Sequence, residues 1–185
     1  VPDSGCGSWL LEPQSTNLLP YSEDFSQWSN NNSVTLTSGQ LAPDGTLGAT
    51  KVSGIIGSSS IYNTASSSET ATRSIYAKTV SGTGTARLMS YFGNTNNLFT
   101  LTEQWQRFEL TGSVAAGGTT FYVDFRDNTQ TLNEFIIWGG QSENLSFSTS
   151  YIPTNGATNT RLQDIATNSG NSTLINSTEG VLYAE

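Results

Sequence analysis

Tyrosine and charged side chains recur on one side of several short segments whose other side is apolar. One segment alternates phenylalanine and valine with Tyr122, Asp124 and Arg126, and similar alternation surrounds Ile75 and Leu88. Successive side chains of a strand point to opposite faces of a sheet. If these strands are neighbours in one sheet, their polar sides form a continuous surface that comprises Tyr76, Arg87, Tyr91, Tyr122, Asp124 and Arg126.

Such a surface suits a hydroxyl-rich ligand. Sugar rings stack their C–H faces on tyrosine and tryptophan, while charged groups and amides bind the hydroxyls. Trp28 is a further ligand-binding candidate near a sheet edge, although a place in the core is equally compatible with the sequence. The alternative for the whole surface is that tyrosine and arginine simply cover the outer face of a sheet.

The sequence argues against catalysis within this chain. It contains no histidine, which excludes Ser-His-Asp and Cys-His arrangements and His-ligated zinc. Paired carboxylates can act on glycosides, but none lies in a recognisable motif; the candidates are Glu23 with Asp24, Asp124 with Asp127, Glu134 and Glu143. We therefore expect a protein that is not an enzyme. The single cysteine, Cys6, permits no intramolecular disulfide.

Composition points to a protein that works outside cells. Only 12% of the residues are charged, about half of the ~25% typical of soluble domains, and Ser, Thr, Asn and Gly take their place. A polar, uncharged surface is common in extracellular, cell-surface and virion proteins. The net charge of -8, with only 7 Lys+Arg, excludes an electrostatic footprint for nucleic acid. No apolar run reaches the ~18 residues of a membrane span, so we expect no membrane insertion.

Strand signals dominate the chain, and helical spacing never persists over ten residues. Gly, Pro, Ser and Asn separate the segments, as is typical of turns. About nine short strands predict an all-β sandwich or barrel. The predicted strands are Val34–Thr37, Ala49–Val52, Ser60–Tyr62, Thr70–Lys78, Ala86–Phe92, Leu98–Leu101, Gln106–Thr111, Thr119–Phe125 and Phe135–Trp138.

The stretch 135–161 is expected to close the fold. Its first four residues form an apolar run that predicts a core strand ending at Gly139, with Trp138 buried. Pro153 forces an extended conformation on Ile152 and cannot donate to a ladder. We expect the Tyr-Ile-Pro turn to pin the exiting chain onto the sandwich. Trp105, which opens a strand, is also expected in the core.

Several pieces of the chain together resemble one known family. They are Ser8–Leu18, Tyr21–Trp28, Ala42–Thr46, Ser74–Lys78, Ile137–Glu143 and Ser150–Thr154. They are similar to the carbohydrate-binding-module-like jelly-roll domains of bacteriophage tail and tail-fibre proteins, over nearly the whole chain from Trp9. The resemblance implies an antiparallel β-sandwich of the jelly-roll, galactose-binding type. It is specific for the family and leaves the ligand open.

Three parts are expected along the chain. Residues 1–16 read as an N-terminal connector, and 17–165 as the β-sandwich. Residues 166–185 combine a polar, low-complexity linker with a strand-like end. In the family that the chain resembles, Glu179–Glu185 opens a following laminin-G-like domain.

The resemblance also implies a structural calcium ion. Jelly-roll carbohydrate-binding modules often carry one between an N-terminal segment and the last strand, and calcium takes six to eight oxygen ligands. No Asp-x-Asp-x-Asp loop is present. The candidate ligands are Glu23, Asp24, Asp44 and Glu143.

Three functional hypotheses follow. The first is a non-catalytic adhesion module of a phage tail or tail-associated protein that binds cell-surface or extracellular glycan. The second is a structural or assembly spacer of the virion, with its polar face against other tail subunits. The third is an accessory module of a secreted polysaccharide-degrading enzyme.

Overall fold

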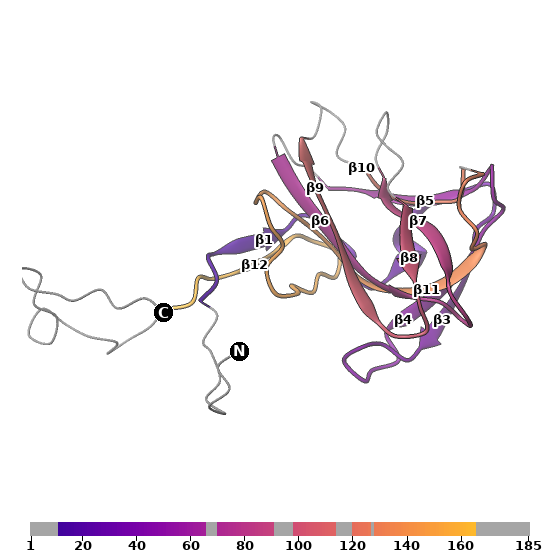
Figure 1. The fold of residues 1–185 in the computed structure, drawn as a ribbon. Coiled ribbons are helices and arrows are strands. Elements are labelled where there is room, and N and C mark those ends of the chain that lie inside the picture. The colour runs from indigo at the N-terminus through magenta and orange to yellow at the C-terminus, as the bar shows by residue number, and fades with distance from the viewer. Residues whose placement is uncertain (1–10, 66–69, 91–97, 114–119, 127, 166–185) are drawn as a thin grey trace, which may run out of the picture.

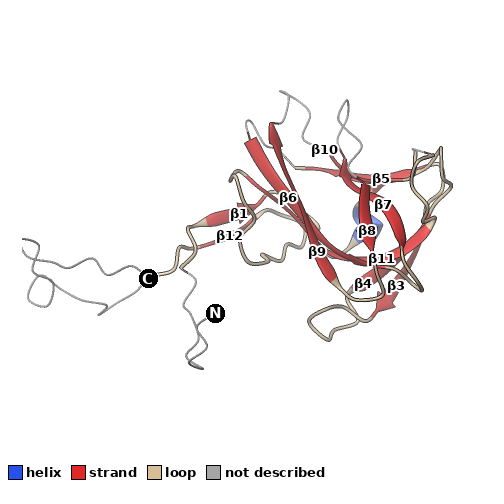
Figure 2. Cartoon of the chain, viewed as in Figure 1, coloured by secondary structure: helices blue, strands red, loops and turns tan. Residues whose placement is uncertain are grey.

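Strands make up nearly all of the regular secondary structure of the described residues, and loops connect them (Figure 2). The computed structural model describes residues 11–65, 70–90, 98–113, 120–126 and 128–165. In this part the only helical element is a 3-10 turn, η1 (Phe25–Gln27), which Asp24 caps. None of the described helical segments is long and apolar enough to cross a membrane.

Two five-stranded antiparallel sheets pack face to face (Figure 1). The first sheet has the order β2–β5–β10–β7–β8, with bounds Ser29–Asn31, Ser60–Thr64, Thr120–Asp124, Gly84–Ser90 and Leu98–Leu101. The second has the order β3–β4–β11–β6–β9, with bounds Thr35–Gln40, Ala49–Ser53, Glu134–Glu143, Thr70–Lys78 and Gln106–Ser113. A separate ribbon pairs β1 (Ser15–Asn17) with β12 (Asn159–Arg161).

The strand order is that of a jelly roll. From β4 to β11 the chain crosses between the sheets at every connection except the one between β7 and β8, which are paired neighbours. This path leaves β5–β10–β7–β8 facing β4–β11–β6–β9. Two interlocked Greek keys of this kind define the jelly-roll sandwich. The expected all-β jelly-roll fold is therefore present.

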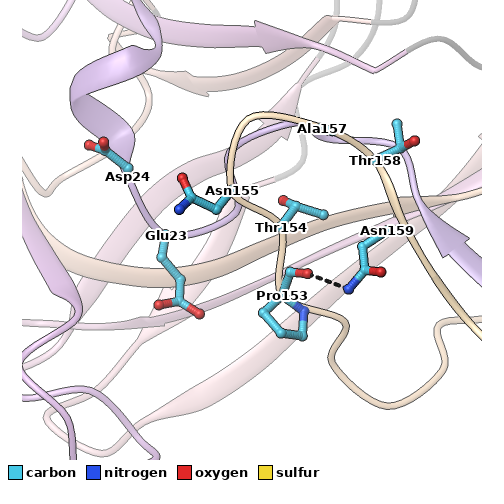
Figure 3. Close-up of a pocket in the computed structure, with 8 residues that line it drawn as sticks. All are labelled: Glu23, Asp24, Pro153, Thr154, Asn155, Ala157, Thr158 and Asn159. Carbon is cyan, nitrogen blue, oxygen red and sulfur yellow. Dashed lines mark hydrogen bonds between the residues drawn. The ribbon is translucent and has the colours of Figure 1, made fainter.

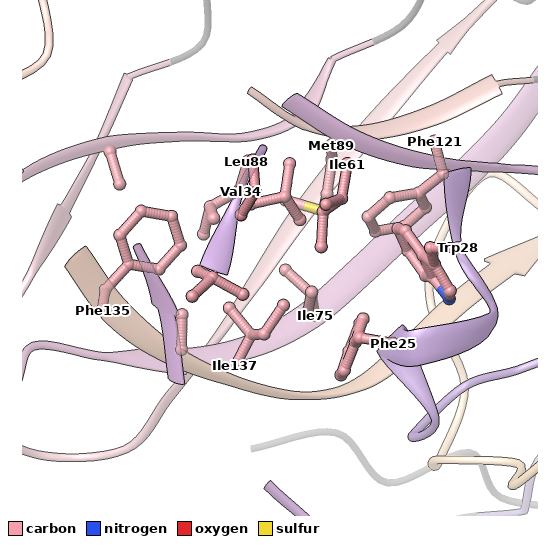
Figure 4. Packing of buried hydrophobic residues seen from close by; sticks show 14 of the residues in the cluster. Phe25, Trp28, Val34, Ile61, Ile75, Leu88, Met89, Phe121, Phe135 and Ile137 are labelled. Atoms are coloured by element: carbon pink, nitrogen blue, oxygen red, sulfur yellow. The ribbon is translucent and has the colours of Figure 1, made fainter. Parts of the chain in front are cut away.

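The core fills the space between the two sheets (Figure 4). Phe121 and Val123 enter it from β10, and Phe135 and Ile137 enter it from β11; all are fully buried. The rings of Phe125 and Phe135 stack across the interface with centroids 5.3 Å apart. Burial of each such side chain contributes about 1.5–3 kcal/mol. The alternation read from the sequence correctly assigns these residues to the inner face.

Strand β11 continues past the Gly-Gly pair as far as Glu143, so the prediction that it ends at Gly139 is wrong. Its register with β6 shifts between Trp138 and Gln141, and Gly139 has a φ of 64°. A side chain at Gly139 would place its Cβ 3.2 Å from two tyrosine rings. Glycine here permits a bulge inside the strand rather than an exit from it.

Buried polar side chains lock the end of β11 to the N-terminal strand. We call this group the polar clamp; it consists of Ser15, Asn17, Gln141, Glu143 and Thr149. Glu143 Oε1 accepts hydrogen bonds from Ser15 Oγ at 2.6 Å and Thr149 Oγ1 at 2.5 Å. Glu143 Oε2 accepts from Gln141 Nε2 at 2.7 Å and from the Thr149 amide at 3.1 Å. The buried carboxylate thus has four protein donors.

Asn17 completes the clamp. Its Nδ2 donates to the carbonyls of Gly140 (3.1 Å) and Ile152 (2.8 Å), and its Oδ1 accepts from the amides of Leu19 and Ser142, both at 3.1 Å. Every hydrogen-bonding position of this amide is used. The Ile152 amide also donates to Gln141 Oε1 at 2.7 Å, which confirms that the Tyr-Ile-Pro turn pins the exiting chain.

The two ends of the described chain lie side by side. Glu12 and Asp164 exchange hydrogen bonds of 3.0 Å, and Arg161 forms an ion pair with Glu12. The β1–β12 ribbon projects from one end of the sandwich (Figure 1). Strand β1 begins within the predicted connector 1–16, and residues 1–10 and 166–185, with the predicted linker and following strand, lie outside the described residues.

The nine predicted strands correspond to β3 through β11, and two face assignments change. Strict alternation with Leu88 places the next residue, Met89, on the polar side of its strand, but Met89 is fully buried in the core and has a φ of 61°. This local irregularity turns both Leu88 and Met89 inward. Trp105 was expected in the core, yet it is only half-buried and packs on the outer side of the second sheet.

Candidate functional site

The outer face of the first sheet carries a group that we call the Tyr–Arg–Asp cluster: Tyr62, Tyr122, Asp124 and Arg126. Tyr62 and Tyr122 are opposite each other in the pairing of β5 with β10. Their ring centroids are 4.9 Å apart and their planes are inclined by 35°. Tyr122 is 7% exposed and Tyr62 is half-buried, so Tyr62 offers the more accessible ring.

Asp124 holds the Arg126 guanidinium over the Tyr122 ring. Arg126 Nε donates to Asp124 Oδ1 at 2.8 Å and Nη2 donates to Oδ2 at 2.7 Å, a bidentate pair. The guanidinium carbon lies 4.4 Å from the Tyr122 ring centroid, within the range of a cation–π interaction. Hydrogen bonding to Asp124 raises the pKa of Arg126. The Arg126 side chain is 39% exposed, against 5% for Asp124.

The structure brings together three predicted site residues, Tyr122, Asp124 and Arg126. Arg87 is next to Asp124 in the β7–β10 pairing but is only 6% exposed, so it is a buried neighbour of the cluster and offers little surface to a ligand. Tyr91 lies outside the described residues. Sequence reasoning missed Tyr62, although the alternation of Ile61 with Tyr62 carried the same signal as in the other strands.

Two predicted site residues do not belong to this surface. Tyr76 is in β6 of the second sheet, so the predicted surface is not continuous. Trp28 is 4% exposed and its Nε1 donates to the Tyr21 carbonyl at 2.9 Å. Its ring packs against Phe25 and Phe121, with centroids 5.0 and 5.5 Å away. Trp28 is therefore a core residue, and its assignment to ligand binding is wrong.

Tyr76 instead joins an outer aromatic group on the second sheet, with Trp105, Trp138 and Tyr151. The ring centroids of Tyr76 and Trp138 are 5.3 Å apart, and those of Trp138 and Tyr151 are 4.5 Å apart. Trp138 is buried as predicted, at 5% exposure, but it is covered by this group rather than by the central core. Burial raises the pKa of the Tyr151 phenol.

A pocket of about 640 Å³ lies beside η1 (Figure 3). We call it the loop pocket, and its lining is Glu23, Asp24, Pro153, Thr154, Asn155, Ala157, Thr158 and Asn159. The loop of residues 153–159, which forms most of this lining, is fixed by two hydrogen bonds from its backbone amides. The Thr154 amide donates to Ser22 Oγ at 2.8 Å, and the Gly156 amide donates to the Pro20 carbonyl at 2.7 Å. Its lining is hydroxyl, amide and carboxylate, without an aromatic ring.

The four carboxylates predicted to bind calcium do not converge. Asp24 and Asp44 each accept hydrogen bonds from residues two positions ahead, Ser26 and Thr46, and Glu143 is occupied by the polar clamp. Among the described residues no three acidic, histidine or cysteine side chains form a metal-binding group. The predicted set does not fit one calcium ion, and calcium dependence stays a prediction for titration to test.

The Tyr–Arg–Asp cluster is equipped for binding. It offers one accessible ring, a fixed guanidinium that keeps part of its surface in solvent, and a carboxylate that positions both. A ligand that has alternating apolar and hydroxyl surfaces matches this set, because rings accept C–H faces and guanidinium groups donate to oxygens. The strand order and this surface define a jelly-roll β-sandwich domain with a polar-aromatic outer face.

No known protein family and no curated protein matches the sequence. Among solved structures, the chain is similar to an exo-β-1,3-galactanase from Phanerochaete chrysosporium, with 12% identity, a TM-score of 0.46, and coverage of 71% of this chain and 30% of that one. It is also similar to tailspike protein 4 of bacteriophage CBA120 (15% identity, TM-score 0.41, coverage of 68% and 21%). A CBM4 structure matches at 14% identity and a TM-score of 0.36, with coverage of 66% and 82%.

The chain spans less than a third of the length of the galactanase and tailspike structures. With TM-scores below 0.5, these similarities carry no argument about ligand or activity. The assignment of the fold rests on the strand order, and the assignment of the site rests on its side chains.

Proposed function

We propose that this chain is a non-catalytic glycan-binding module that holds its ligand on the Tyr–Arg–Asp cluster. The observation that carries the proposal is the bidentate Asp124–Arg126 pair stacked on Tyr122, beside the more accessible Tyr62. The pair fixes a hydrogen-bond donor next to an aromatic face. A sugar ring on Tyr62 would place hydroxyl oxygens within reach of that donor.

The electrostatics of the pair favour recognition over simple surface cover. A guanidinium held by two hydrogen bonds and a ring loses less side-chain freedom when it binds a ligand. The Arg126 side chain is 39% exposed, so its guanidinium can donate to a ligand oxygen. Binding at one such site is weak, and display of several copies raises it through effective concentration.

We propose further that the module is an adhesion domain, attached at one end to a phage tail or tail-associated protein. The family resemblance of the sequence supports the phage setting. The chain enters and leaves the sandwich side by side, joined through Glu12 and Asp164, and this favours a pendant domain over a spacer in line with its neighbours. The alternative to the phage setting is an accessory module of a secreted polysaccharide-degrading enzyme, which could be attached through adjacent ends in the same way.

The proposal is tested by titration calorimetry of the chain against polysaccharides selected on a glycan array. We expect Tyr62→Ala and Arg126→Ala each to weaken binding by about tenfold or more, since each removes one principal contact. Phe147→Ala, which removes another exposed ring, is the matched control and should leave affinity unchanged. Failure of every polysaccharide to bind a multivalent display of the chain would sink the proposal.

The setting is tested separately. Neighbouring virion genes would support the phage assignment, whereas a catalytic domain beside this one would support the accessory module. Burial of Tyr62 and Arg126 against another subunit in an assembled particle would favour the structural spacer instead.

A further inference from the structure

The loop pocket contains a polar side chain that the fold leaves unused. Thr154 is 8% exposed, and its Oγ1 has no hydrogen-bond partner among the described residues. Its backbone, in contrast, is bonded to Ser22 through the amide (2.8 Å) and the carbonyl (3.3 Å). A buried hydroxyl without a partner is unfavourable for folding alone. It is explained if a ligand supplies the missing hydrogen bond.

The two carboxylates of the loop pocket only accept hydrogen bonds, whereas Asn155 and Thr158 can both donate and accept. Glu23 Oε1 accepts from the Tyr151 hydroxyl at 2.9 Å, and Asp24 Oδ1 accepts from Ser26. The second oxygen of each carboxylate has no donor in the described part of the chain. Asn159 Nδ2 donates to the Pro153 carbonyl at 3.0 Å, which leaves its Oδ1 available. A complementary ligand therefore offers donors to these free oxygens.

The charge of the loop pocket further restricts the class of ligand that it can bind. The lining has two carboxylates and no basic side chain, and the whole chain has a net charge of -8. An anionic ligand is disfavoured, and a protonated amine gains from the nearby carboxylates. Figure 3 shows the carboxylates of Glu23 and Asp24 pointing in different directions, an arrangement better suited to separate donors of one ligand than to a single metal ion.

We propose that the loop pocket is a second ligand site, which takes one amino-sugar unit in its protonated form. The volume of about 640 Å³ lies within the range of small-molecule sites. The ammonium group pairs with Glu23, and the ring hydroxyls exchange hydrogen bonds with Thr154 and Asn159. The loop is anchored at both ends, so its backbone is in place before the ligand arrives, and the buried Thr154 hydroxyl has to turn toward the ligand. This site is distinct from the Tyr–Arg–Asp cluster.

The test titrates the 185-residue chain with D-glucosamine, D-glucose, D-glucuronate and CaCl₂ in turn, at pH 6. Nuclear magnetic resonance follows the backbone amide signals of 154–159. We expect saturable shifts with glucosamine at concentrations several-fold lower than with glucose, and no shifts with glucuronate. The preference for glucosamine should shrink at high ionic strength, because salt screens the charge interaction.

Variants separate a ligand role from a structural one. Thr154→Val should weaken glucosamine and glucose equally, by about twofold to tenfold for one hydrogen bond, without lowering the unfolding midpoint. Glu23→Gln should remove most of the preference for glucosamine and retain glucose binding. Tyr62→Ala on the first sheet should leave all loop-pocket shifts unchanged, so this site can fail while glycan binding at the cluster stands.

Several results would overturn the proposal. It is wrong if no sugar shifts the signals of 154–159, if glucuronate binds as well as glucosamine, or if only Ca²⁺ shifts them. It is also wrong if Thr154→Val destabilises the fold and leaves sugar binding intact, because the hydroxyl would then serve the structure.

Discussion

The polar clamp and the Tyr–Arg–Asp cluster each place a carboxylate in a buried position, but they use it differently. Glu143 in the clamp is fully buried, and its four donors all come from the protein. Asp124 in the cluster is 4% exposed, and it holds an arginine whose side chain is 39% exposed. One carboxylate joins strands to each other, and the other presents a charged group to solvent.

The difference separates stabilising polar groups from binding ones. A buried network with every position filled rigidifies the fold and has no capacity for a ligand. A network that ends in an exposed guanidinium retains hydrogen-bond donors for a ligand. Changes in the clamp should therefore affect folding, and changes in the cluster should affect affinity.

Glu143→Ala should cause the largest effect. It removes the acceptor of the buried Ser15 hydroxyl and leaves Gln141 Nε2 and Thr149 Oγ1 with only long contacts of 3.4 Å to backbone carbonyls. We expect a loss of about 3–5 kcal/mol in the free energy of unfolding. Urea denaturation measures this loss. Glycan affinity of the molecules that remain folded should be unchanged. A loss below about 1 kcal/mol would show that the clamp does not hold the fold.

Asn17→Ala should have a smaller effect of the same kind. It deletes four hydrogen bonds, two of them to the segments around Gly140 and Ile152, and we expect a loss of about 2–3 kcal/mol by urea denaturation. Thr16→Ala on the same short strand is the control, since Thr16 bonds only to Thr160 at the surface. Equal losses for the two variants would contradict a specific role of the buried amide.

Arg126→Lys sharpens the comparison from the other side. Lysine keeps the charge but cannot form the bidentate pair with Asp124, so we expect about a fivefold to tenfold loss of glycan affinity by calorimetry. The free energy of unfolding should change by less than about 1 kcal/mol, because the side chain is substantially exposed. A large loss of stability with unchanged affinity would reverse the assignment of this cluster.

Alkaline pH should lower the stability of the fold by a smaller margin, through Tyr151 of the outer aromatic group, which lies outside both regions. Burial raises the pKa of Tyr151, so the folded state keeps this proton after the unfolded chain loses it near pH 10. The contribution is complete below that pH and is lost as pH rises above it, by up to about 1.4 kcal/mol per pH unit. Thermal unfolding at pH 9 to 11 should show a steeper decline for the native chain than for Tyr151→Phe. Equal slopes would contradict the account.

Much of the fold could be predicted from the sequence. Alternation around Phe121 and Phe135 identifies inner-face residues, because a strand with one buried side has a period of two. The same alternation predicts opposite faces for Leu88 and Met89, which is wrong because a positive φ at Met89 turns both side chains inward. A Gly-Gly pair signals a turn locally, but here the strand continues through a bulge at Gly139, beside the rings of Tyr76 and Tyr151.

The candidate site was predictable in part. Tyr122, Asp124 and Arg126 share one face by alternation alone, so their grouping follows from spacing. Tyr76 shows the same pattern, but alternation does not reveal which sheet a strand joins, and a jelly roll sends successive strands to opposite sheets. The clamp was not foreseen, because its partners Ser15 and Glu143 are 128 positions apart in the chain.

The central claim is that glycan binds on the Tyr–Arg–Asp cluster. The most direct measurement is mapping of chemical-shift changes on the chain during titration with the best oligosaccharide from the glycan array. We predict that the largest changes fall on Tyr62, Tyr122 and Arg126, with the clamp residue Gln141 unaffected. Saturable changes that are absent from these three residues and fall on the outer aromatic group of the second sheet would contradict the claim.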